Sequence, residues 1–384
     1  MRLLIIGRAQ DCADHASWCQ HMGHQVQYVE SLNVEQELMG CMDDIVSFAD
    51  GAQLFVEQLR IQCGLPSRGL DAVGILTDKV LFKSHPAVQP YIAQHLEIDP
   101  VMSKDEAVAM VMSSRLRFPV VVKPSNGFYS AGVVRADNVD ELKRAYVQAR
   151  RVCTTLAARA GASRVIVEKY LDGNEFAVDG FIVNDKVRPL LLHRKRPRLE
   201  GPTFHETAYL TERFDSERGT EALEMLERIV AGVGLRNSPF HAEFRFDADG
   251  RLYVLEVAPR LAGSGATTQR LMMVCIGLDA YECLHGTFRS SLDLTPKRDR
   301  IGLEYDFGPE ATGILCNVAE VAAACEQRGA TSIIRYRSDG DLVLGPPNNV
   351  ECILTAFFDC TSLSVGQALF DDIANNCHIK TESK

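Results

Sequence analysis

The chain has 384 residues, with 41 Lys and Arg against 51 Asp and Glu, so its formal charge is −10, and 46% of its residues are hydrophobic. This length predicts two or three domains with substantial cores, and a charged fraction of 24% argues against a disordered or low-complexity chain. The acidic balance argues against a general binder of nucleic acids or of anionic membranes, although it permits a local basic pocket for phosphates.

The cysteines and the amino-terminal residues indicate in which cellular compartment the protein is expected. Twelve cysteines form no Cys-x-x-Cys pair and no cluster at zinc spacing. We expect reduced core thiols, and neither Cys275 nor Cys283 has the local signature of a catalytic thiol. Because Leu3–Ile6 is too short for a signal-peptide core and no stretch approaches the roughly 18 apolar residues of a membrane span, we expect a cytoplasmic protein without membrane contact.

Residues 1–77 are expected to form a Rossmann-like domain. Strands at Leu3–Ile6 and Gln25–Val29 flank a helix that ends near His21, and a strand at Ile45–Phe48 with a helix at Gly51–Gln62 continues the alternation. This order predicts a parallel sheet covered by helices, that is, an α/β unit. The first turn lacks the glycines of G-x-G-x-x-G, so no NAD or FAD site is expected there.

From residue 78 the pattern indicates an α+β arrangement. Expected helices are Asp105–Arg115, Val139–Ala160 and Glu221–Gly232, and expected strands are Phe118–Pro124, Val165–Glu168, Glu175–Val183 and Val187–Leu192. We expect one domain over 78–300, with a mobile lid over about 105–175, and a carboxyl-terminal part over 301–384 that packs on it. In that last part the expected strands are Thr312–Cys316, Ser332–Arg337 and Val350–Phe358, and the expected helix is Ser364–Asn375.

A hairpin over 240–257 has the most informative pattern. Alternation on both sides of a turn predicts one apolar face, made of Phe240, Ala242, Phe244, Phe246, Tyr253, Leu255 and Val257.

Two glutamates share the other face of this hairpin. If Phe246 pairs with Arg251, then Glu243 lies opposite Val254 and Glu256 is its diagonal neighbour, roughly 7 Å away at the backbone. Two carboxylates at that spacing can converge on a divalent cation. A solvated outer sheet face is the alternative explanation.

The segment after the hairpin favours the cation site. Arg260 can hold a phosphate or a carboxylate with two parallel hydrogen bonds, and the glycines at 263 and 265 let backbone N–H groups approach an anion. A carboxylate pair, a divalent ion and an arginine are what an ATP-phosphoryl site requires.

These residues resemble the ATP-grasp superfamily, in particular its carboxylate-amine ligases, which include amino-acid ligases. The resemblance covers most of the chain, is densest over 78–265, and implies an ATP-grasp fold that holds ATP between two antiparallel sheets. It also fits the absence of a G-x-x-x-x-G-K-[ST] loop.

The resemblance implies the following roles. Lys83, at the end of Asp78-Lys79-Val80-Leu81-Phe82-Lys83, and Lys123, on its strand, contact ATP. Ser130 belongs to a flexible loop over the phosphates, Ser125–Val133. Glu168, Tyr170 and Leu171 form the adenine hinge, and Glu175 binds the ribose. Glu243 and Glu256 hold Mg²⁺, with Mn²⁺ as an alternative ion, and Arg260 and Gly263 face the substrate, with Arg260 and Lys123 in catalytic roles.

The sequence departs from the family pattern at two places. Ala258 replaces the asparagine of E-x-N-P-R, which removes an amide ligand of the second Mg²⁺, and the loop over the phosphates carries Phe128-Tyr129 where many members have more glycine. Lys83 and Lys123, taken singly, are also compatible with exposed surface lysines.

The basic cluster His193–Arg198 suggests phosphate-backbone binding, but the net charge and the lack of interleaved aromatic residues argue against a nucleic-acid partner. We expect it to begin a loop that borders the substrate pocket, with Lys195 either contacting a substrate anion or lying in solvent.

The resemblance implies an ATP-dependent, ADP-forming ligase that joins a small carboxylate to a small amine through an acylphosphate. The alternatives are an ATP-grasp carboxylase, a formate-using transformylase and a nucleotide-binding protein without turnover, while the missing glycines oppose a nicotinamide oxidoreductase. The carboxyl-terminal part either closes the substrate pocket or forms a homodimer surface.

Overall fold

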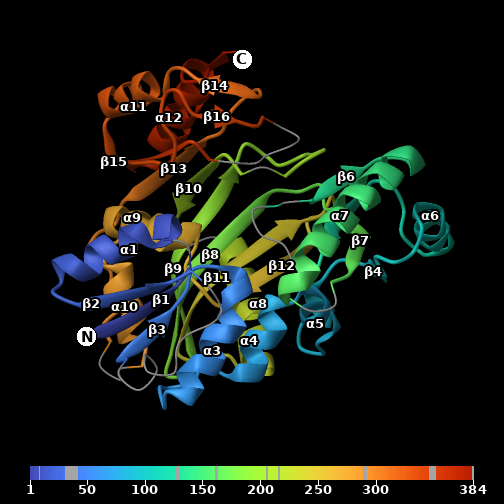
Figure 1. The fold of residues 1–384 in the computed structure, drawn as a ribbon, viewed down its shortest axis with the longest axis horizontal. Helices are drawn as coiled ribbons and strands as arrows, with labels where there is room; N and C mark the ends of the chain where they lie inside the picture. The colour runs from blue at the N-terminus through green and yellow to red at the C-terminus, as the bar shows by residue number, and fades with distance from the viewer. Residues whose placement is uncertain are drawn as a thin grey trace.

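A computed structural model of the protein describes residues 1–7, 9–30, 42–125, 130, 132–160, 163–204, 206–214, 217–288, 292–345 and 352–382. Within these ranges the strands form four sheets, and the largest of them lies between the amino-terminal part, a projecting smaller sheet and the carboxyl-terminal helices (Figure 1). The expected combination of a parallel amino-terminal sheet with antiparallel sheets is confirmed. None of the described helices has both the length and the apolar character that crossing a membrane requires.

The amino-terminal sheet has the order β2-β1-β3, with parallel pairs throughout. Its strands are β1 (Arg2–Ile6), β2 (Gln25–Val29) and β3 (Asp44–Val46), and its helices are α1 (Ala9–His21), the 3-10 turn η1 (Asp50–Ala52) and α3 (Gln53–Gln62). The predicted β-α-β opening is confirmed, because α1 connects β1 to the parallel strand β2. Every residue of β1 after Arg2 is buried.

A group of contacts, which we call the docking seam, fixes this part against two later helices, α9 (Ala266–Cys275) and α10 (Ala280–Gly286). It joins Arg270 to Asp14 at 2.5 Å, His15 to His285 at 2.9 Å between the Nε2 atoms, His285 to Asp44 at 2.7 Å, and Arg60 to Asp44. Burial would raise the pKa of Asp44, but His285 and Arg60 outweigh it and lower this pKa to about 2. Each acid of the docking seam therefore has a basic partner.

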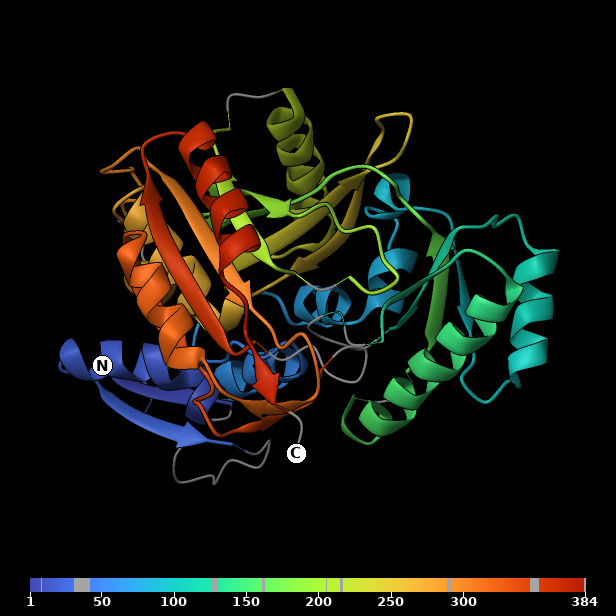
Figure 2. The same ribbon diagram turned by 90° about the horizontal axis from the view of Figure 1, so that it is seen from above.

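The smaller sheet projects from the body of the molecule with its two helices on its outer side (Figure 2). Its order is β4-β7-β5-β6 and all its pairs are antiparallel. The elements are β4 (His95–Ile98), α6 (Lys104–Ser113), β5 (Val120–Pro124), β6 (Val134–Ala136), α7 (Val139–Ala160) and β7 (Val165–Lys169). Ser103 caps α6 in a capping box with Glu106, which explains why the helix begins there.

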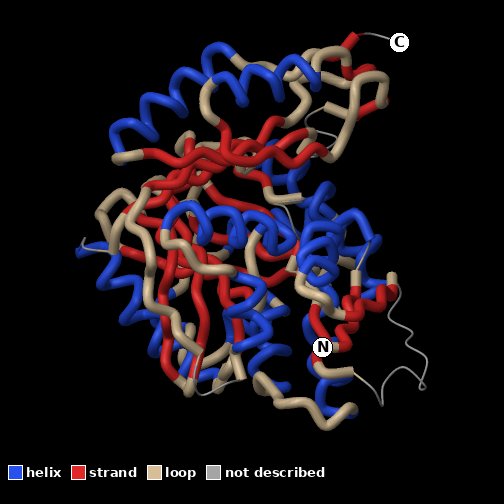
Figure 3. The backbone as a smooth tube through the Cα atoms, turned by 90° about the vertical axis from the view of Figure 1, so that its left-hand side faces the viewer, coloured by secondary structure: helices blue, strands red, loops and turns tan. Residues whose placement is uncertain are grey.

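The large sheet has eight strands among the described residues, in the order β12-β11-β8-β9-β10-β13-β17-β15. Their bounds are β8 (Glu175–Val183), β9 (Lys186–Arg196), β10 (Ala208–Glu212), β11 (Ser238–Phe246), β12 (Leu252–Ala258), β13 (Ile301–Phe307), β15 (Ala330–Arg335) and β17 (Leu354–Cys360). One face is apolar. Two short helices, α4 (Leu70–Thr77) and α5 (Lys79–Ser84), and the long helix α8 (Glu217–Val233) cover its first half, and α11 (Val318–Gln327) and α12 (Leu363–Asn376) cover its second half (Figure 3).

The remaining elements are short. The turns η2 (Gln89–Tyr91) and η3 (Gly263–Gly265) are 3-10 helices, and β14 (Gly313–Leu315), β16 (Leu342–Val343) and β18 (Thr381–Glu382) form a small sheet near the carboxyl terminus. Because β13, β17 and β15 continue the large sheet, the part beyond residue 300 shares a sheet with the region before it. The division of the chain at residues 77 and 300, and the lid over about 105–175, remain proposals.

Two expectations about the large sheet are wrong. The strands β10 and β13 were not expected from the sequence, and the strand expected to end at Leu192 is β9, which runs on to Arg196. Most of the basic cluster is therefore strand and not loop, because β10 pairs with residues 192–196, from Ala208 with Arg196 to Glu212 with Leu192.

The register of the hairpin also differs from the prediction. Phe246 pairs with Leu252, not with Arg251, because Arg251 belongs to the turn, where its carbonyl accepts from the Asp247 N–H. The register shifts again after Glu243, where Leu255 is an extra residue, so that Glu243 lies directly opposite Glu256. This is a β-bulge.

The bulge also changes the apolar face of the hairpin. Leu252, Val254 and Val257 join the main core, while Tyr253 packs in a small separate cluster with Leu255. The predicted placement of Tyr253 and Leu255 in the core face is wrong, because the bulge reverses the alternation along β12.

Candidate active site

The site lies on the polar face of the large sheet. Glu243 on β11 is opposite Glu256 on β12, and Tyr209 on β10 is opposite both Lys195 on β9 and Glu304 on β13. Since alternate residues of a strand share a face, this register collects ionisable side chains from five neighbouring or nearby strands.

A first cluster, the lysine cluster, joins α5 to the smaller sheet. The carboxylate of Glu168 on β7 contacts the Lys83 ammonium at 2.8 Å and the Lys123 ammonium at 2.5 Å. All three residues are at least 94% buried, so neither lysine is an exposed surface residue. Burial opposes ionisation of Glu168, but the two ammonium groups outweigh it and lower the pKa of Glu168 to about 2.

A second cluster, the carboxylate cluster, surrounds Lys195. Its Nζ atom lies 2.7 Å from Glu175, 2.5 Å from Glu206 and 2.8 Å from Glu243. Despite burial, these carboxylates raise the pKa of Lys195 well above its usual value. Lys195 is only 4% exposed, so the alternative of a solvated side chain is excluded.

A buried chain of hydrogen bonds holds Glu243 from its other side. His241 contacts Glu243 at 3.2 Å and Asp179 at 2.5 Å, and Asp179 in turn contacts His193 at 2.9 Å. Burial would lower the pKa of His241, but Asp179 and Glu243 raise it to about 10, so the imidazole is cationic. The Thr268 hydroxyl donates to Asp179 at 3.3 Å, which ties this chain to the start of α9.

Helix α5 links the two clusters. Asp78 caps the helix by accepting from two backbone N–H groups, and Lys79 and Lys83 follow four residues apart on one side of it. Lys83 reaches Glu168 of the smaller sheet, while Lys79 reaches Glu256 of the large sheet at 2.9 Å. One short helix therefore places ammonium groups against carboxylates of both sheets.

Arg260 and Gly263 lie in the loop between β12 and α9. The Arg260 guanidinium holds Asp50 of the amino-terminal part through two contacts, at 2.5 and 2.8 Å. Gly263 has a φ of +52°, and a Cβ atom there would lie 1.9 Å from the Thr267 hydroxyl, so only glycine fits. The predicted substrate roles of both residues remain proposals.

The expected nucleotide hinge follows β7. Tyr170 and Leu171 are buried, and the Tyr170 N–H donates to the Pro119 carbonyl at 3.3 Å. Glu175 binds Arg245 at 3.1 Å in addition to Lys195, so both of its oxygens face cations. Its expected ribose contact stays a prediction.

The expected loop over the phosphates falls mostly outside the described residues, which omit 126–129 and 131. Ser130 is described; it has a φ of +51°, and its carbonyl accepts from the Val133 N–H at 3.0 Å.

The cysteines fit a structural role. Burial raises the pKa of Cys275 and Cys283 to about 12, so neither is a ready thiolate at neutral pH.

Four residues of the site were not assigned from the sequence. Lys79 stands inside the segment Asp78–Lys83, the alternating hairpin pattern puts His241 on the same face as Glu243, and Glu206 follows the basic cluster, so local signals existed for these three. Asp179 sits in an apolar strand and gave no signal of its own.

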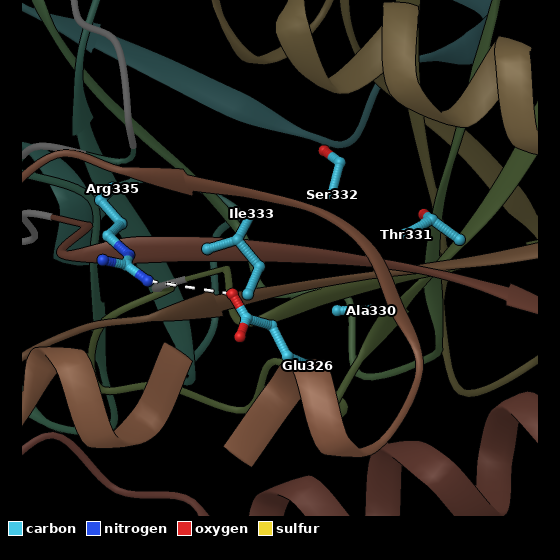
Figure 4. Close-up of a pocket in the computed structure, with 6 residues that line it drawn as sticks. All are labelled: Glu326, Ala330, Thr331, Ser332, Ile333 and Arg335. Atoms are coloured by element: carbon cyan, nitrogen blue, oxygen red, sulfur yellow. Dashed lines mark ion pairs between the residues drawn. The ribbon is translucent and has the colours of Figure 1, made fainter. Parts of the chain in front are cut away.

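A surface hollow elsewhere carries no comparable chemistry. It lies along the edge strand β15, lined by Ala330–Ile333, Arg335 and Glu326, and Figure 4 shows Glu326 paired with Arg335 across it, at 4.0 Å.

Comparison with known proteins agrees with this geometry. Residues 116–268 match the family model described as ATP-grasp domain. The "ATP-grasp enzyme fsqD" of Aspergillus fumigatus is 26% identical over 217 residues, which are 53% of this chain and 35% of that protein. The "L-arginine-specific L-amino acid ligase" of Bacillus subtilis is 22% identical over 307 residues, 78% of this chain and 70% of that protein. The chain thus spans about a third of the first relative's length.

Solved structures share the fold over the whole chain. The L-amino acid ligase from Bacillus licheniformis superposes with a TM-score of 0.82 at 19% identity, covering 100% of this chain and 99% of that one. An ADP complex of N5-carboxyaminoimidazole ribonucleotide synthetase gives 0.73 at 13% identity, covering 97% and 96%. The protein carries an ATP-grasp domain and has the ATP-grasp fold, as its motifs predicted.

Proposed function

We propose that this chain is an ATP-dependent carboxylate-amine ligase. It activates a carboxylate, that of an amino acid, as an acylphosphate and joins it to an amine, and ADP and phosphate are the other products. The proposal depends above all on helix α5, which sets the lysine cluster and the Glu256 side of the hairpin next to each other.

The charges of the two clusters complement those of magnesium-bound ATP. In the lysine cluster two ammonium groups face one carboxylate, which favours an anion such as a polyphosphate. In the carboxylate cluster Lys195, the His241 imidazolium and Arg245 balance the three carboxylates, so what this cluster offers a cation is its oxygen ligands.

The donor set fits magnesium. Glu243 and Glu256 would hold it, with Glu175 and Glu206 nearby, and carboxylate oxygens are the ligands that Mg²⁺ prefers. When bound, the ion supplies charge neutralisation at the phosphate oxygens.

The reaction then has two steps. A substrate carboxylate oxygen attacks the γ-phosphorus of ATP, the bond to the bridging oxygen breaks and ADP leaves, while Lys83 and Lys123 offset charge on the phosphate oxygens. An amine attacks the carbonyl carbon of the acylphosphate, phosphate leaves, and the nitrogen loses a proton. In this proposal Arg260 and the backbone N–H groups near Gly263 stabilise the oxyanion of this second step.

Because acylphosphates hydrolyse, water must be kept out. The smaller sheet with α6 and α7 projects beside the site and, in this proposal, closes over it before phosphoryl transfer.

The test measures phosphate release from ATP and Mg²⁺ with amino acids offered singly and in pairs, and identifies the products by mass spectrometry. A ligase releases phosphate with a particular pair and gives a product lighter than their sum by one water. Phosphate release that requires bicarbonate, with a carboxylated product, would contradict the proposal and favour a carboxylase, which the fold shared with the carboxyaminoimidazole synthetase makes the second candidate.

A further inference from the structure

Three acidic side chains lie together at the far end of the polar face, on β13 and just before β10. Glu304 and Asp306 are two residues apart on one face of β13, and the Asp306 N–H donates to the Thr207 carbonyl at 2.7 Å, which brings Asp306 beside Glu206. We call Glu206, Glu304 and Asp306 the acidic subsite.

Two members of the acidic subsite, Glu304 and Asp306, accept hydrogen bonds from neutral donors. Glu304 accepts one hydrogen bond, from the Thr267 hydroxyl at 2.7 Å, and its other oxygen, Oε2, is buried without a hydrogen-bond partner. Asp306 accepts from the Thr355 hydroxyl and from the Cys352 thiol. Across the described parts of the chain, no lysine or arginine forms an ion pair with either carboxylate. Unpaired buried carboxylates are costly, so this arrangement needs an explanation.

Electrostatics agree with the geometry. Burial first, and then the neighbouring carboxylates, raise the pKa of Glu304 well above its usual range, and burial raises the pKa of Asp306 to about 6. A cation placed between them would reverse both shifts.

The position relative to the reacting centre suggests what the cation is. Lys195, Tyr209 and Glu304 occupy adjacent strands, and two strand spacings amount to roughly 10 Å. Thr267, which binds Glu304, begins α9 directly after the loop that carries Arg260 and Gly263. A group bound at Glu304 would therefore lie several bonds from a substrate carboxylate that meets ATP near Glu243.

The spread of the oxygens argues against a metal ion. Glu175, Glu206 and Glu243 offer ligand atoms within 4.8 Å of one another, whereas Glu304 and Asp306 form no such group with Glu206 in the described structure. A wider arrangement suits an extended cation that donates several hydrogen bonds, as a guanidinium does.

We propose that Glu304 and Asp306, with Glu206, bind a positively charged side chain of an amino-acid substrate, a guanidinium or an alkylammonium. This inference rests on the proposed ligase function and names its substrate class. Glu304 sets the specificity for basic side chains, because its buried Oε2 atom stays without a hydrogen-bond partner when a neutral side chain binds.

The experiment compares isosteric pairs of substrates. Phosphate release is measured with arginine against citrulline and with lysine against norleucine, each offered with a panel of second amino acids, for the wild type, Glu304→Gln and Asp306→Asn. We expect the basic member of a pair to be preferred by about a hundredfold in kcat/KM, and Glu304→Gln to lower kcat/KM for it by about tenfold or more while citrulline and norleucine are unaffected. Glu320→Gln, an exposed change of the same kind on α11, is the matched control and leaves the preference unchanged.

Calorimetric binding of arginine and citrulline separates this inference from the ligase proposal, because binding needs no turnover. Arginine that binds the wild type more tightly than citrulline, and loses this advantage in Glu304→Gln, supports the acidic subsite even if no phosphate is released. The acidic subsite is overturned if the basic and the neutral amino acid of a pair bind equally tightly or turn over equally fast. A Glu304→Gln variant that needs more Mg²⁺ with every substrate alike also overturns it, since the carboxylates would then serve a metal ion.

Discussion

The docking seam and the active-site clusters are both buried and ionic, but their charges are arranged differently. In the docking seam Asp14 meets Arg270, and Asp44 meets both Arg60 and His285. At the site, Glu168 faces two lysines, and three carboxylates share Lys195.

In the proposed function, this difference distinguishes charges that hold two parts of the fold together from charges that bind a ligand. A buried ion pair with matched partners fixes one part of a protein against another, and removal of one partner is strongly destabilising. In the lysine cluster two ammonium groups share one carboxylate, and in the proposed function this excess of positive charge favours binding of a ligand of the opposite sign. Changes at the site should therefore affect activity and ligand response, and changes at the docking seam should affect stability alone.

The largest expected effect is on turnover in Glu256→Gln. The substitution keeps the size of the side chain and removes a charge that faces the expected magnesium, so phosphate release should fall by about a hundredfold or more. Circular dichroism and thermal unfolding check that the variant is folded, and Glu320→Gln again serves as the control. A folded Glu256→Gln protein with the wild-type rate would refute the metal assignment.

Lys195→Met tests the carboxylate cluster through its effect on the stability of the protein. It leaves three carboxylates without their shared ammonium and should lower the free energy of unfolding by about 3 kcal/mol. Added Mg²⁺ should restore part of the loss, because the ion supplies the missing charge. Thermal unfolding with and without Mg²⁺ measures both effects, and Lys143→Met on α7 should change neither. An unchanged melting temperature would contradict the role of Lys195.

Lys123→Met tests the lysine cluster. Lys83 continues to neutralise Glu168, so the fold should persist, while the affinity for ATP should fall by about tenfold through loss of a charged contact. Isothermal titration with a non-hydrolysable ATP analogue measures it. If affinity stays at the wild-type value, the cluster does not bind the nucleotide.

The last prediction concerns the docking seam, where the effect is absent at neutral pH and appears only on acidification. Burial, with a smaller contribution from His285, lowers the pKa of His15 from 6.5 to about 3. Between these pH values the unfolded chain binds a proton that the folded chain does not, so His15 makes stability fall as the pH drops from 6.5 to 3, by at most about 1.4 kcal/mol per pH unit.

His15→Gln should therefore flatten the pH dependence of unfolding in that window without changing turnover at neutral pH. Denaturant unfolding at several pH values between 6.5 and 3 measures the slope, and His378→Gln at the surface is the control. Equal slopes in the wild type and His15→Gln would show that His15 titrates alike in both states.

The sequence carried enough information for the fold class and for the order of most elements. Local periodicity placed the β-α-β opening, β8 and α12, and the motifs identified the ATP-grasp fold, because these signals depend on neighbours in the chain. The family motifs singled out Lys83, Lys123, Glu243 and Glu256 as candidates, and each of them forms one of the ion pairs described above.

The predictions that failed depend on contacts between residues that lie far apart in the chain. β10 and β13 pair across more than 90 residues, so no local pattern showed that Tyr209 would face Glu304. The partners of Lys195 come from three separate segments, and the burial that decides its role appears only after the sheet is assembled. The hairpin register failed for a different reason, because one unpaired residue is invisible in an alternating pattern.

The extra residue of the bulge, Leu255, affects how the sequence of this hairpin can change during evolution. Leu255 has no partner across the ladder, so an in-frame loss of its codon would leave Glu243 opposite Glu256 and restore regular alternation along β12. The number of residues between the two acids is thus freer to vary than their pairing, and a sequence search for related hairpins should tolerate a gap of eleven as well as twelve.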